Sequence, residues 1–393
     1  MKGSAMKFLF ASDSFKGSLS SEETAAMLTR AAREVFGEIE CDQLVVADGG
    51  EGATDAVLNA TGGVKRGVSA HDPRMAPIQA SYGSLRDGRA IVEAASASGL
   101  TLVPCEKRDP LIATSYGTGE LILAALADGA RDITLALGGV ATVDGGTGCG
   151  RALGVRFLDA EGRELEGRGR DLERVAEIDV SRLDSRIAQA RITVMNDVTN
   201  PLVGANGAAR VFGPQKGASS EVVERLERGM VNYAAALRRC FGVDPTQIVG
   251  GGAAGGLGAF AALFLKGEMK SGIDAVLDLV NFDARLQGVD LVVTGEGRTD
   301  EQSCYGKVVQ GIGRRAKRLG VPVVALSGAL GAGASALFDD GIESFATTID
   351  APMTLESAME RAKELYYFGA IRMFRLVRAG MKIADKAVKP SND

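Results

Sequence analysis

Short runs of hydrophobic residues alternate with stretches of helical periodicity along most of the chain. Most of these runs end in glycine and polar residues; they are KFLFA (7–11), QLVVA (43–47), DITLALGG (132–139), ITVM (192–195), DLVVT (290–294) and VPVVAL (321–326). Continuous apolar runs of this length, alternating with helices, are typical of buried strands in a parallel sheet. The pattern therefore predicts an α/β fold with a largely parallel sheet.

Helix boundaries are clearest where capping residues agree with the periodicity. Ser20 is followed three residues later by Glu23, which predicts a capping box, and Gly37 provides a C-terminal stop. Ser220 is predicted to cap a second helix that runs to about Cys240 and is ended by Gly242, and an amphipathic final helix is predicted over residues 355 to about 380.

The segment from 64 to 92 has a different pattern. Apolar and polar residues alternate there, and turn signals stand at Asp72-Pro73 and Asp87-Gly88. Period-two alternation interrupted by such turns predicts antiparallel strands. We expect a mixed sheet in this segment, within a second domain.

Composition excludes several classes of function. The chain has 393 residues, a net charge of −5 and no Trp, so it lacks the basic surface and stacking aromatics of a nucleic-acid-binding protein. It contains no apolar run of 18 residues and no signal peptide, and its five cysteines form no C-x-x-C pair. We expect a cytoplasmic protein that binds neither nucleic acid nor membrane.

The histidine count narrows the chemistry further. His71 is the only histidine, so zinc sites with two or three histidines are impossible. A Ser-His-Asp triad would also need the G-x-S-x-G elbow that the chain lacks. We interpret His71 as a surface or loop residue and assign acid–base work to Asp, Glu or Lys.

One glycine cluster matches a cofactor motif. Residues 250–256, GGGAAGG, fit G-x-G-x-x-G, and Asp274 follows about twenty residues later. Only QIV precedes the cluster, which is too short for a convincing strand. A nicotinamide dehydrogenase therefore remains the weaker alternative. The Walker A motif is absent, because Val308 stands where Ser or Thr is needed.

The remaining glycine clusters combine free backbone N–H groups with carboxylates and cations. The acids are Asp48, Glu51, Asp144, Asp197, Glu296 and Asp300, and the cations in these loops are Lys16, Lys216, Arg298 and Lys307. Glycine amides at helix starts favour anions, whereas carboxylates beside an anion require a cation such as Mg²⁺. A single Asp-Gly cluster is more often only a turn. Several of them at strand ends predict phosphoryl transfer.

Several sequence blocks resemble the bacterial glycerate kinase family of type 1. They are DSFKGSLSS (13–21), VADGGEG (46–52), SASGL (96–100), TSYGTGEL (114–121), LGGVATVDGGTGCGRALG (137–154), NDVTNPLVGANGAARVFGPQKGA (196–218), GGGAAGGLGA (250–259), SGID (271–274) and TGEGRTDEQSCYGKV (294–308). The resemblance extends from Lys7 to about Ala370. Its departures, at Ala11, Val140 and Val143, involve no charge.

The resemblance implies an activity and a domain organisation. Such an enzyme transfers the γ-phosphoryl group of ATP to D-glycerate with Mg²⁺, favouring 2-phosphoglycerate, with 3-phosphoglycerate left open, in organic-acid catabolism. It implies a Rossmann-like domain (1–64 and 286–393), an inserted mixed α/β domain (65–285), and an active site in the cleft between them. A homo-oligomer is compatible with these features.

Site residues follow from the loops and the resemblance together. We expect Asp197, Lys216, Asp300 and Lys16 to be catalytic, with Asp197 and Asp300 holding Mg²⁺. Substrate or nucleotide contacts are expected from Asp13, Ser14, Asp48, Gly49, Gly50, Glu51, Gly145, Gly146, Asn200, Glu296, Arg298 and Lys307. A catalytically silent metabolite-binding protein is the third alternative.

Overall fold

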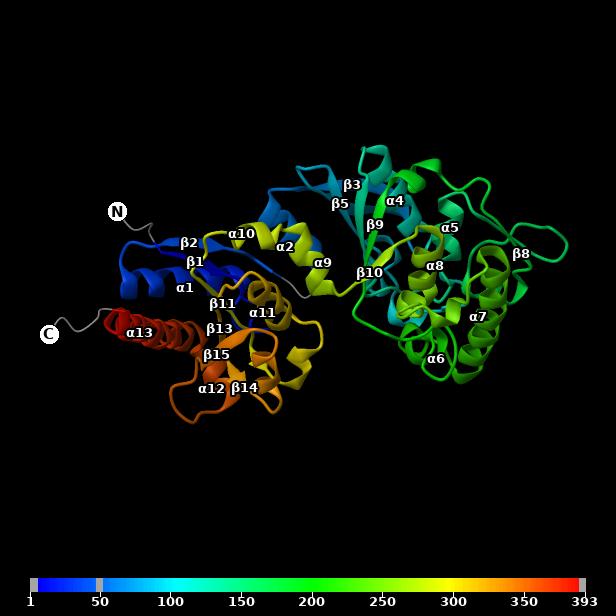
Figure 1. Ribbon diagram of the computed structural model, residues 1–393. Helices are drawn as coiled ribbons and strands as arrows, with labels where there is room; N and C mark the ends of the chain where they lie inside the picture. The colour runs from blue at the N-terminus through cyan, green and yellow to red at the C-terminus, as the bar shows by residue number, and fades with distance from the viewer. Residues whose placement is uncertain (1–5, 47–51, 389–393) are drawn as a thin grey trace. The chain divides into compact units, whose positions relative to one another are not determined.

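The computed structural model describes residues 6–46 and 52–388, with the side chains of 385–388 left undescribed. The chain forms two compact units, Met1–Asp48 with Val276–Asp393, and Gly49–Ala275. In Figure 1 the first unit has the dark-blue and the yellow-to-red elements, and the second has the light-blue to green ones. Asp48, Gly49, Gly50 and Glu51, predicted as ligand contacts, lie outside the described residues.

The first unit is built on a parallel sheet of five strands. They are β1 (Lys7–Phe10), β2 (Glu40–Gln43), β11 (Leu291–Thr294), β13 (Val323–Ser327) and β15 (Ile342–Thr347). Their order is β15-β13-β11-β1-β2, and every neighbouring pair is parallel. The order reverses direction between β1 and β11, which in open α/β sheets is the switch point where ligands bind. This is the Rossmann-like sheet that the sequence predicts.

The helices of this unit are α1 (Ser21–Phe36), α10 (Phe282–Arg285), α11 (Val308–Arg318), α12 (Leu355–Glu360) and α13 (Ala362–Val388) (Figure 1). All of them except α12 bury apolar residues. Phe8 on β1 stacks on Phe374 of α13, with ring centroids 5.9 Å apart. Both rings are buried in one core cluster with Leu28 of α1. The two chain ends therefore share a core, although more than 300 residues separate them in the sequence.

The second unit has a mixed sheet in the order β10-β9-β6-β5-β4-β3. Its strands are β3 (Val64–His71), β4 (Pro77–Ser84), β5 (Arg89–Glu93), β6 (Asp132–Ala136), β9 (Arg191–Met195) and β10 (Glu268–Lys270). β3, β4 and β5 pair antiparallel, and β5, β6, β9 and β10 pair parallel. The predicted antiparallel segment over 64–92 is confirmed.

The other elements of the second unit surround this sheet. Its α-helices are α2 (Ala53–Thr61), α3 (Ala95–Ser98), α4 (Tyr116–Ala127), α5 (Thr147–Ala152), α6 (Ala208–Phe212), α7 (Ser220–Phe241) and α8 (Leu257–Phe264), and α9 (Gly272–Leu279) begins in it. A small antiparallel pair consists of β7 (Arg156–Leu158) and β8 (Glu177–Asp179). Phe157 and Tyr233 are buried at the centre of the unit.

Most predicted boundaries agree with the structure, and three differ. The capping box of Ser20 and Glu23 and the stop at Gly37 are confirmed. The strand predicted over QLVVA lies earlier, at Glu40–Gln43, because those residues pair with β1. Helix α7 takes Ser219 as its N-cap, so it begins with Ser220 inside the first turn. The final helix is divided at Arg361 into α12 and α13.

The domain boundaries at 64/65 and 285/286 remain predictions. The compact units divide earlier at both places, after Asp48 and after Ala275. Helix α2 is in the second unit because it packs on the mixed sheet, where the Thr54 N–H donates to Glu93 Oε1 at 2.9 Å.

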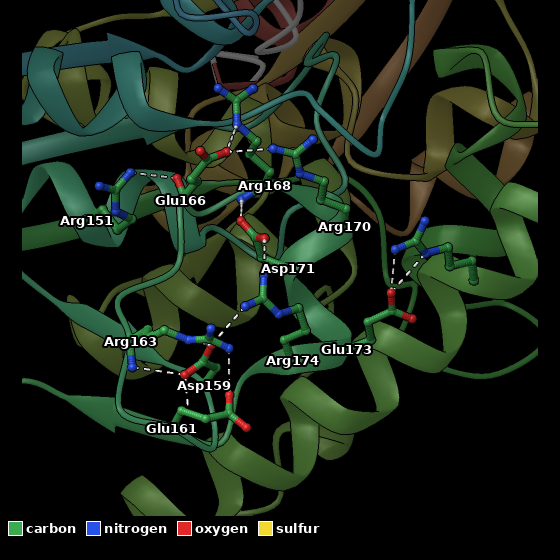
Figure 2. Close-up of polar contacts among 11 residues, drawn as sticks. Arg151, Asp159, Glu161, Arg163, Glu166, Arg168, Arg170, Asp171, Glu173 and Arg174 are labelled. Carbon is green, nitrogen blue, oxygen red and sulfur yellow. Dashed lines mark hydrogen bonds and ion pairs between the residues drawn. The ribbon is translucent and has the colours of Figure 1, made fainter.

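An ion-pair network stabilises the segment that connects β7 and β8. Figure 2 shows Asp159 between two guanidinium groups, those of Arg163 (Nε, 3.0 Å) and Arg174 (Nη2, 2.8 Å). Only 4% of Asp159 is exposed. Burial would raise the pKa of this carboxyl, but hydrogen bonds from Arg163 and Arg174 hold it below its ordinary value. The carboxylate therefore stabilises the fold at neutral pH, and this contribution disappears as the pH falls through the lowered pKa.

We expect Asp159→Asn to lower the melting temperature at pH 7, because the variant leaves two guanidinium groups without their shared anion. Glu161→Gln is the matched control, since Glu161 also bonds Arg163 but its side chain is 64% exposed. Thermal unfolding of both variants at pH 7 and pH 3 checks the idea. Equal melting temperatures for Asp159→Asn and wild type at pH 7 would contradict it.

Candidate functional site

The loops after β1 and β11 meet at the switch point of the first unit. The Asp13 N–H donates to the carbonyl of Gly295 at 2.9 Å, directly beyond the last paired residues of the two strands. Gly295 also lets this loop pass close to β13, because a Cβ there would lie 1.9 Å from the carbonyl oxygen of Leu326. The predicted loop residues of both strands are therefore side by side.

Glu296 is the buried carboxylate at this edge, with 8% of the residue exposed. Thr299 Oγ1 donates to Glu296 Oε1 at 3.2 Å and lies 2.7 Å from Ser327 Oγ, at the end of β13. Burial raises the pKa of Glu296; a hydrogen bond from Ser303 and the charge of Lys307 oppose this rise, and the charge of Asp13 adds to it. The charges of Asp13 and Lys307 therefore both affect the pKa of Glu296.

The turn after β1 presents its polar groups outward. The Ser14 N–H donates to Asp13 Oδ1 at 2.7 Å, which forms a tight local turn. Lys16 is exposed, and among the described residues its side chain has no ion pair. Gly17 follows in the left-handed region at φ 80°. The arrangement leaves one ammonium group available beside the switch point.

Asp300, a predicted metal ligand and catalytic residue, caps a short 3₁₀ turn, Glu301–Cys304. Its Oδ1 accepts from the Gln302 N–H at 3.0 Å, and its Oδ2 lies 3.0 Å from Arg298 Nε. Both oxygens therefore have protein partners, while the Arg298 side chain is 70% exposed. Asp300 would have to give up one of these contacts to bind a cation.

In the second unit, Asp144 is a fully buried anchor of the glycine loop after β6. Its carboxylate accepts from the Ser115 N–H and Oγ, both at 2.7 Å, and from the N–H groups of Gly146 and Gly148 at 3.1 and 3.3 Å. Burial raises the pKa of Asp144, and these four donors oppose the rise. Gly145 and Gly146 have φ of 64° and 73°, a region that favours glycine. Asp144 therefore fixes the conformation of this loop through its hydrogen bonds.

Lys216 is buried beside the same loop, with 3% of the residue exposed. Its Nζ donates to the carbonyl oxygen of Thr142 at 2.7 Å. Burial lowers the pKa of Lys216 to about 8, and the charge of Asp144 opposes this. In this structure Lys216 supports the loop backbone from within the core, whereas the sequence predicts a catalytic cation.

Asp197 follows β9 and contacts the start of α9. Its Oδ1 accepts from the Gly272 N–H, at the first residue of that helix, at 2.7 Å. The residue is exposed. Asn200, predicted to contact substrate, uses its Nδ2 to donate to the carbonyl of Asn206 at 2.8 Å. Asp197 thus lies at the carboxyl edge of the second sheet.

The structure groups the predicted residues into separate sets. Asp197 and Asp300, predicted to share a metal, belong to different units. Within residues 6–46 and 52–388, no group of three His, Cys, Asp or Glu side chains is arranged to hold a metal ion. Thr299 and Ser327, which the sequence did not single out, contact Glu296 directly or through one another. Thr299 lies in the TGEGRTDEQSCYGKV block, and Ser327 directly follows the apolar run at 321–326.

The 250–256 glycine cluster does not have the setting of a dinucleotide site. A 3₁₀ turn precedes it, Pro245–Gln247, where the motif requires a strand. A Cβ on Gly255 would lie 2.0 Å from the carbonyl oxygen of Thr142, and the Gly252 N–H donates to the Asn200 carbonyl at 2.9 Å. These glycines are needed for close backbone packing.

His71 is the last residue of β3 and is partly buried. Its Nδ1 lies 2.9 Å from Glu120 Oε1, and its N–H donates to the same carboxylate at 2.8 Å. The interpretation of His71 as a surface or loop residue agrees with its side chain, which is 37% exposed, but the residue ends a strand and ties it to helix α4. Among the helices that the structure describes, none is both long and apolar enough to span a membrane.

Comparison with known proteins gives consistent results. Residues 8–378 match the model of the glycerate kinase family. The chain is 44% identical to a glycerate kinase of Bacillus cereus and 43% identical to the glycerate 2-kinase of Escherichia coli, each match covering 91% of this chain and 94% of the relative. A crystal structure from Salmonella typhimurium LT2, provisionally assigned as glycerate kinase 2, superposes with a TM-score of 0.85 at 42% identity and covers 96% of this chain and 100% of that one. The chain therefore belongs to the glycerate kinase family.

Proposed function

We propose that this chain is an ATP-dependent glycerate kinase, which transfers the γ-phosphoryl group of ATP to an alcohol group of D-glycerate. The observation that carries this proposal is 40–44% identity to several relatives named glycerate kinase, over about nine tenths of the chain. The first unit supports it, because acids, hydroxyls and the cations Lys16 and Lys307 gather at one sheet edge. Phosphoryl transfer depends on such positioned polar groups.

Mg²⁺ is the cofactor that we propose. It is usually held by one or two carboxylates together with substrate phosphates, and when bound it neutralises phosphate charge. Asp197 fits this use because it is exposed just after the end of β9. Asp300 fits less well, since Arg298 and Gln302 occupy its two oxygens.

We propose 2-phosphoglycerate as the product. One relative, from Escherichia coli, is named a glycerate 2-kinase at 43% identity. Phosphorus NMR of the product separates the two positions, and a 3-phosphate would overturn this assignment. The five cysteines are free thiols, which fits a reducing cytoplasm as the compartment. Assembly into a homo-oligomer stays a prediction.

The decisive experiment measures ADP formation with D-glycerate, ATP and Mg²⁺. We expect ADP to form in proportion to glycerate and to stop when EDTA removes the metal. Oxidation of NAD(P)H with hydroxypyruvate, without ADP formation, would instead support a dehydrogenase. Thermal stabilisation by both ligands without any turnover would support a silent binding protein.

A further inference from the structure

We propose that Glu296 is the general base of this reaction, the group that takes the proton from the attacking glycerate hydroxyl. The proposal rests on the proposed kinase function and adds a residue role to it. It depends on a comparison of the carboxylates that the structure describes at the carboxyl edges of the two sheets, and on the hydroxyl groups that contact Glu296.

Two other carboxylates at these edges are less suited to this role, because their oxygens already have protein partners. Asp144 accepts four hydrogen bonds and is fully buried, so it has no oxygen directed to solvent. Asp300 is paired with the Arg298 guanidinium and accepts from the Gln302 N–H. A base needs an oxygen that can accept a hydrogen bond from the substrate hydroxyl.

Glu296 has a different set of partners. Nine tenths of the residue is buried, and among the described residues its side-chain donors are the hydroxyls of Thr299 and Ser303. The charged groups that act on it are Lys307, which lowers the pKa of Glu296, and Asp13, which raises it. Burial prevails, so the pKa stays above its ordinary value. A base works best when its pKa is shifted toward the working pH, and burial is the usual means for Glu.

The position of Glu296 suits a substrate at the switch point. It stands two residues after β11, next to the Asp13–Gly295 hydrogen bond that joins the two loops. Its orientation is fixed by the Thr299 hydroxyl at 3.2 Å, and Thr299 is in turn fixed by Ser327 Oγ at 2.7 Å. The segment after β11 and the last residue of β13 therefore hold this carboxylate in place.

The chemical step balances without another reactant. The hydroxyl O–H bond of glycerate breaks and its proton moves to a Glu296 carboxylate oxygen. The hydroxyl oxygen forms a bond to the γ-phosphorus, and the bond from that phosphorus to the bridging oxygen breaks, releasing ADP. Glu296 then returns its proton to solvent.

The test compares Glu296→Gln with wild type in kcat, in glycerate binding and in pH dependence. We expect kcat to fall by at least about 10²-fold, the usual loss on removing a general base, while glycerate still protects the variant from thermal unfolding. A base acts when deprotonated, so wild-type kcat should fall as the pH drops through the raised pKa of Glu296. Glu296→Gln should lack this acid limb, and Glu296→Asp should keep it with reduced kcat.

A second variant keeps the carboxylate and removes its orienting hydroxyl. Thr299→Val deletes a hydrogen bond that lowers the pKa of Glu296, so its acid limb should move to higher pH. Glu301→Gln is the control, because Glu301 is exposed and should leave both kcat and the pH profile unchanged.

Full kcat in Glu296→Gln, or an unchanged acid limb in that variant, would overturn the assignment of the base alone. Wild-type protein that forms no ADP from D-glycerate would overturn the proposed kinase function, and the base with it.

Discussion

Asp197→Asn should lower kcat by about 10²–10⁴-fold and leave the melting temperature nearly unchanged. Asn keeps an acceptor oxygen for the Gly272 N–H, and Asn and Asp are about equal as partners of helix N-termini. The variant therefore removes the negative charge and keeps the oxygen that the Gly272 N–H contacts. Mg²⁺-dependent ADP formation and thermal unfolding, measured on the same preparation, report the two effects separately.

Asp197→Ala and Glu268→Gln complete the comparison. The Ala variant also loses the acceptor for Gly272, so we expect it to be less stable as well as less active. Glu268, on the neighbouring strand β10, is exposed, and Glu268→Gln should have wild-type kinetics. If Asp197→Asn retains full kcat at every Mg²⁺ concentration, Asp197 is only a helix cap.

Much of the fold could be predicted because its signals are local. The apolar runs at 132–139 and 290–294 contain β6 and β11, and alternation over 64–92 gave the antiparallel strands. The run at 43–47 was misplaced because an apolar pattern does not fix where pairing begins. The pairing of β2 with β1 starts at Glu40, where Lys7 lies opposite.

The candidate site was less predictable, because burial depends on residues distant in the sequence. The sequence predicts Lys216 to be a loop cation, yet its ammonium group donates a hydrogen bond to the carbonyl of Thr142, 74 residues earlier. The Thr299–Ser327 contact joins residues 28 apart. Only the Thr299–Glu296 contact, three residues apart, is short enough to be proposed from spacing.

The glycine-rich segment at 250–256 illustrates the same limit. Its pattern suggests a cofactor loop, but its glycines are required by backbone contacts with Thr142 and Pro201. A Cβ on Gly252 would lie 2.2 Å from the Pro201 carbonyl oxygen. A motif defined by glycine alone does not distinguish glycines needed for close packing from glycines that bind a ligand. The secondary structure before the motif does distinguish them, because a dinucleotide site follows a strand.

The buried Lys216 gives the second large effect, on both catalysis and pH-dependent stability. Lys216→Met keeps the apolar stem but removes the donor to Thr142, in the loop that carries Gly145 and Gly146. We expect kcat/KM to fall by about 10²-fold, the cost of a displacement of about 1 Å at a catalytic loop. Lys16→Met is the comparison, since Lys16 is exposed and its loss should leave stability unchanged.

The effect on stability should depend on pH in a defined direction. The pKa of Lys216 is lowered from 10.5 to about 8, so burying its ammonium group destabilises the wild-type fold fully below pH 8. This cost disappears as the pH rises to 10.5, and amounts to about 3 kcal/mol at about 1.4 kcal/mol for each pKa unit. At pH 7 Lys216→Met has no buried ammonium group and so lacks this destabilisation. It leaves the Thr142 carbonyl without its donor, which lowers the free energy of unfolding by about 1–3 kcal/mol.

The melting temperatures of Lys216→Met and wild type should therefore be similar at pH 7 and separate as the pH approaches 10, with the variant the less stable. Lys16→Met should follow wild type throughout this range. If the difference in melting temperature between Lys216→Met and wild type does not change from pH 7 to pH 10, Lys216 is not buried in its charged form at pH 7. Wild-type kcat/KM in Lys216→Met would show that the glycine loop holds its catalytic shape without this hydrogen bond.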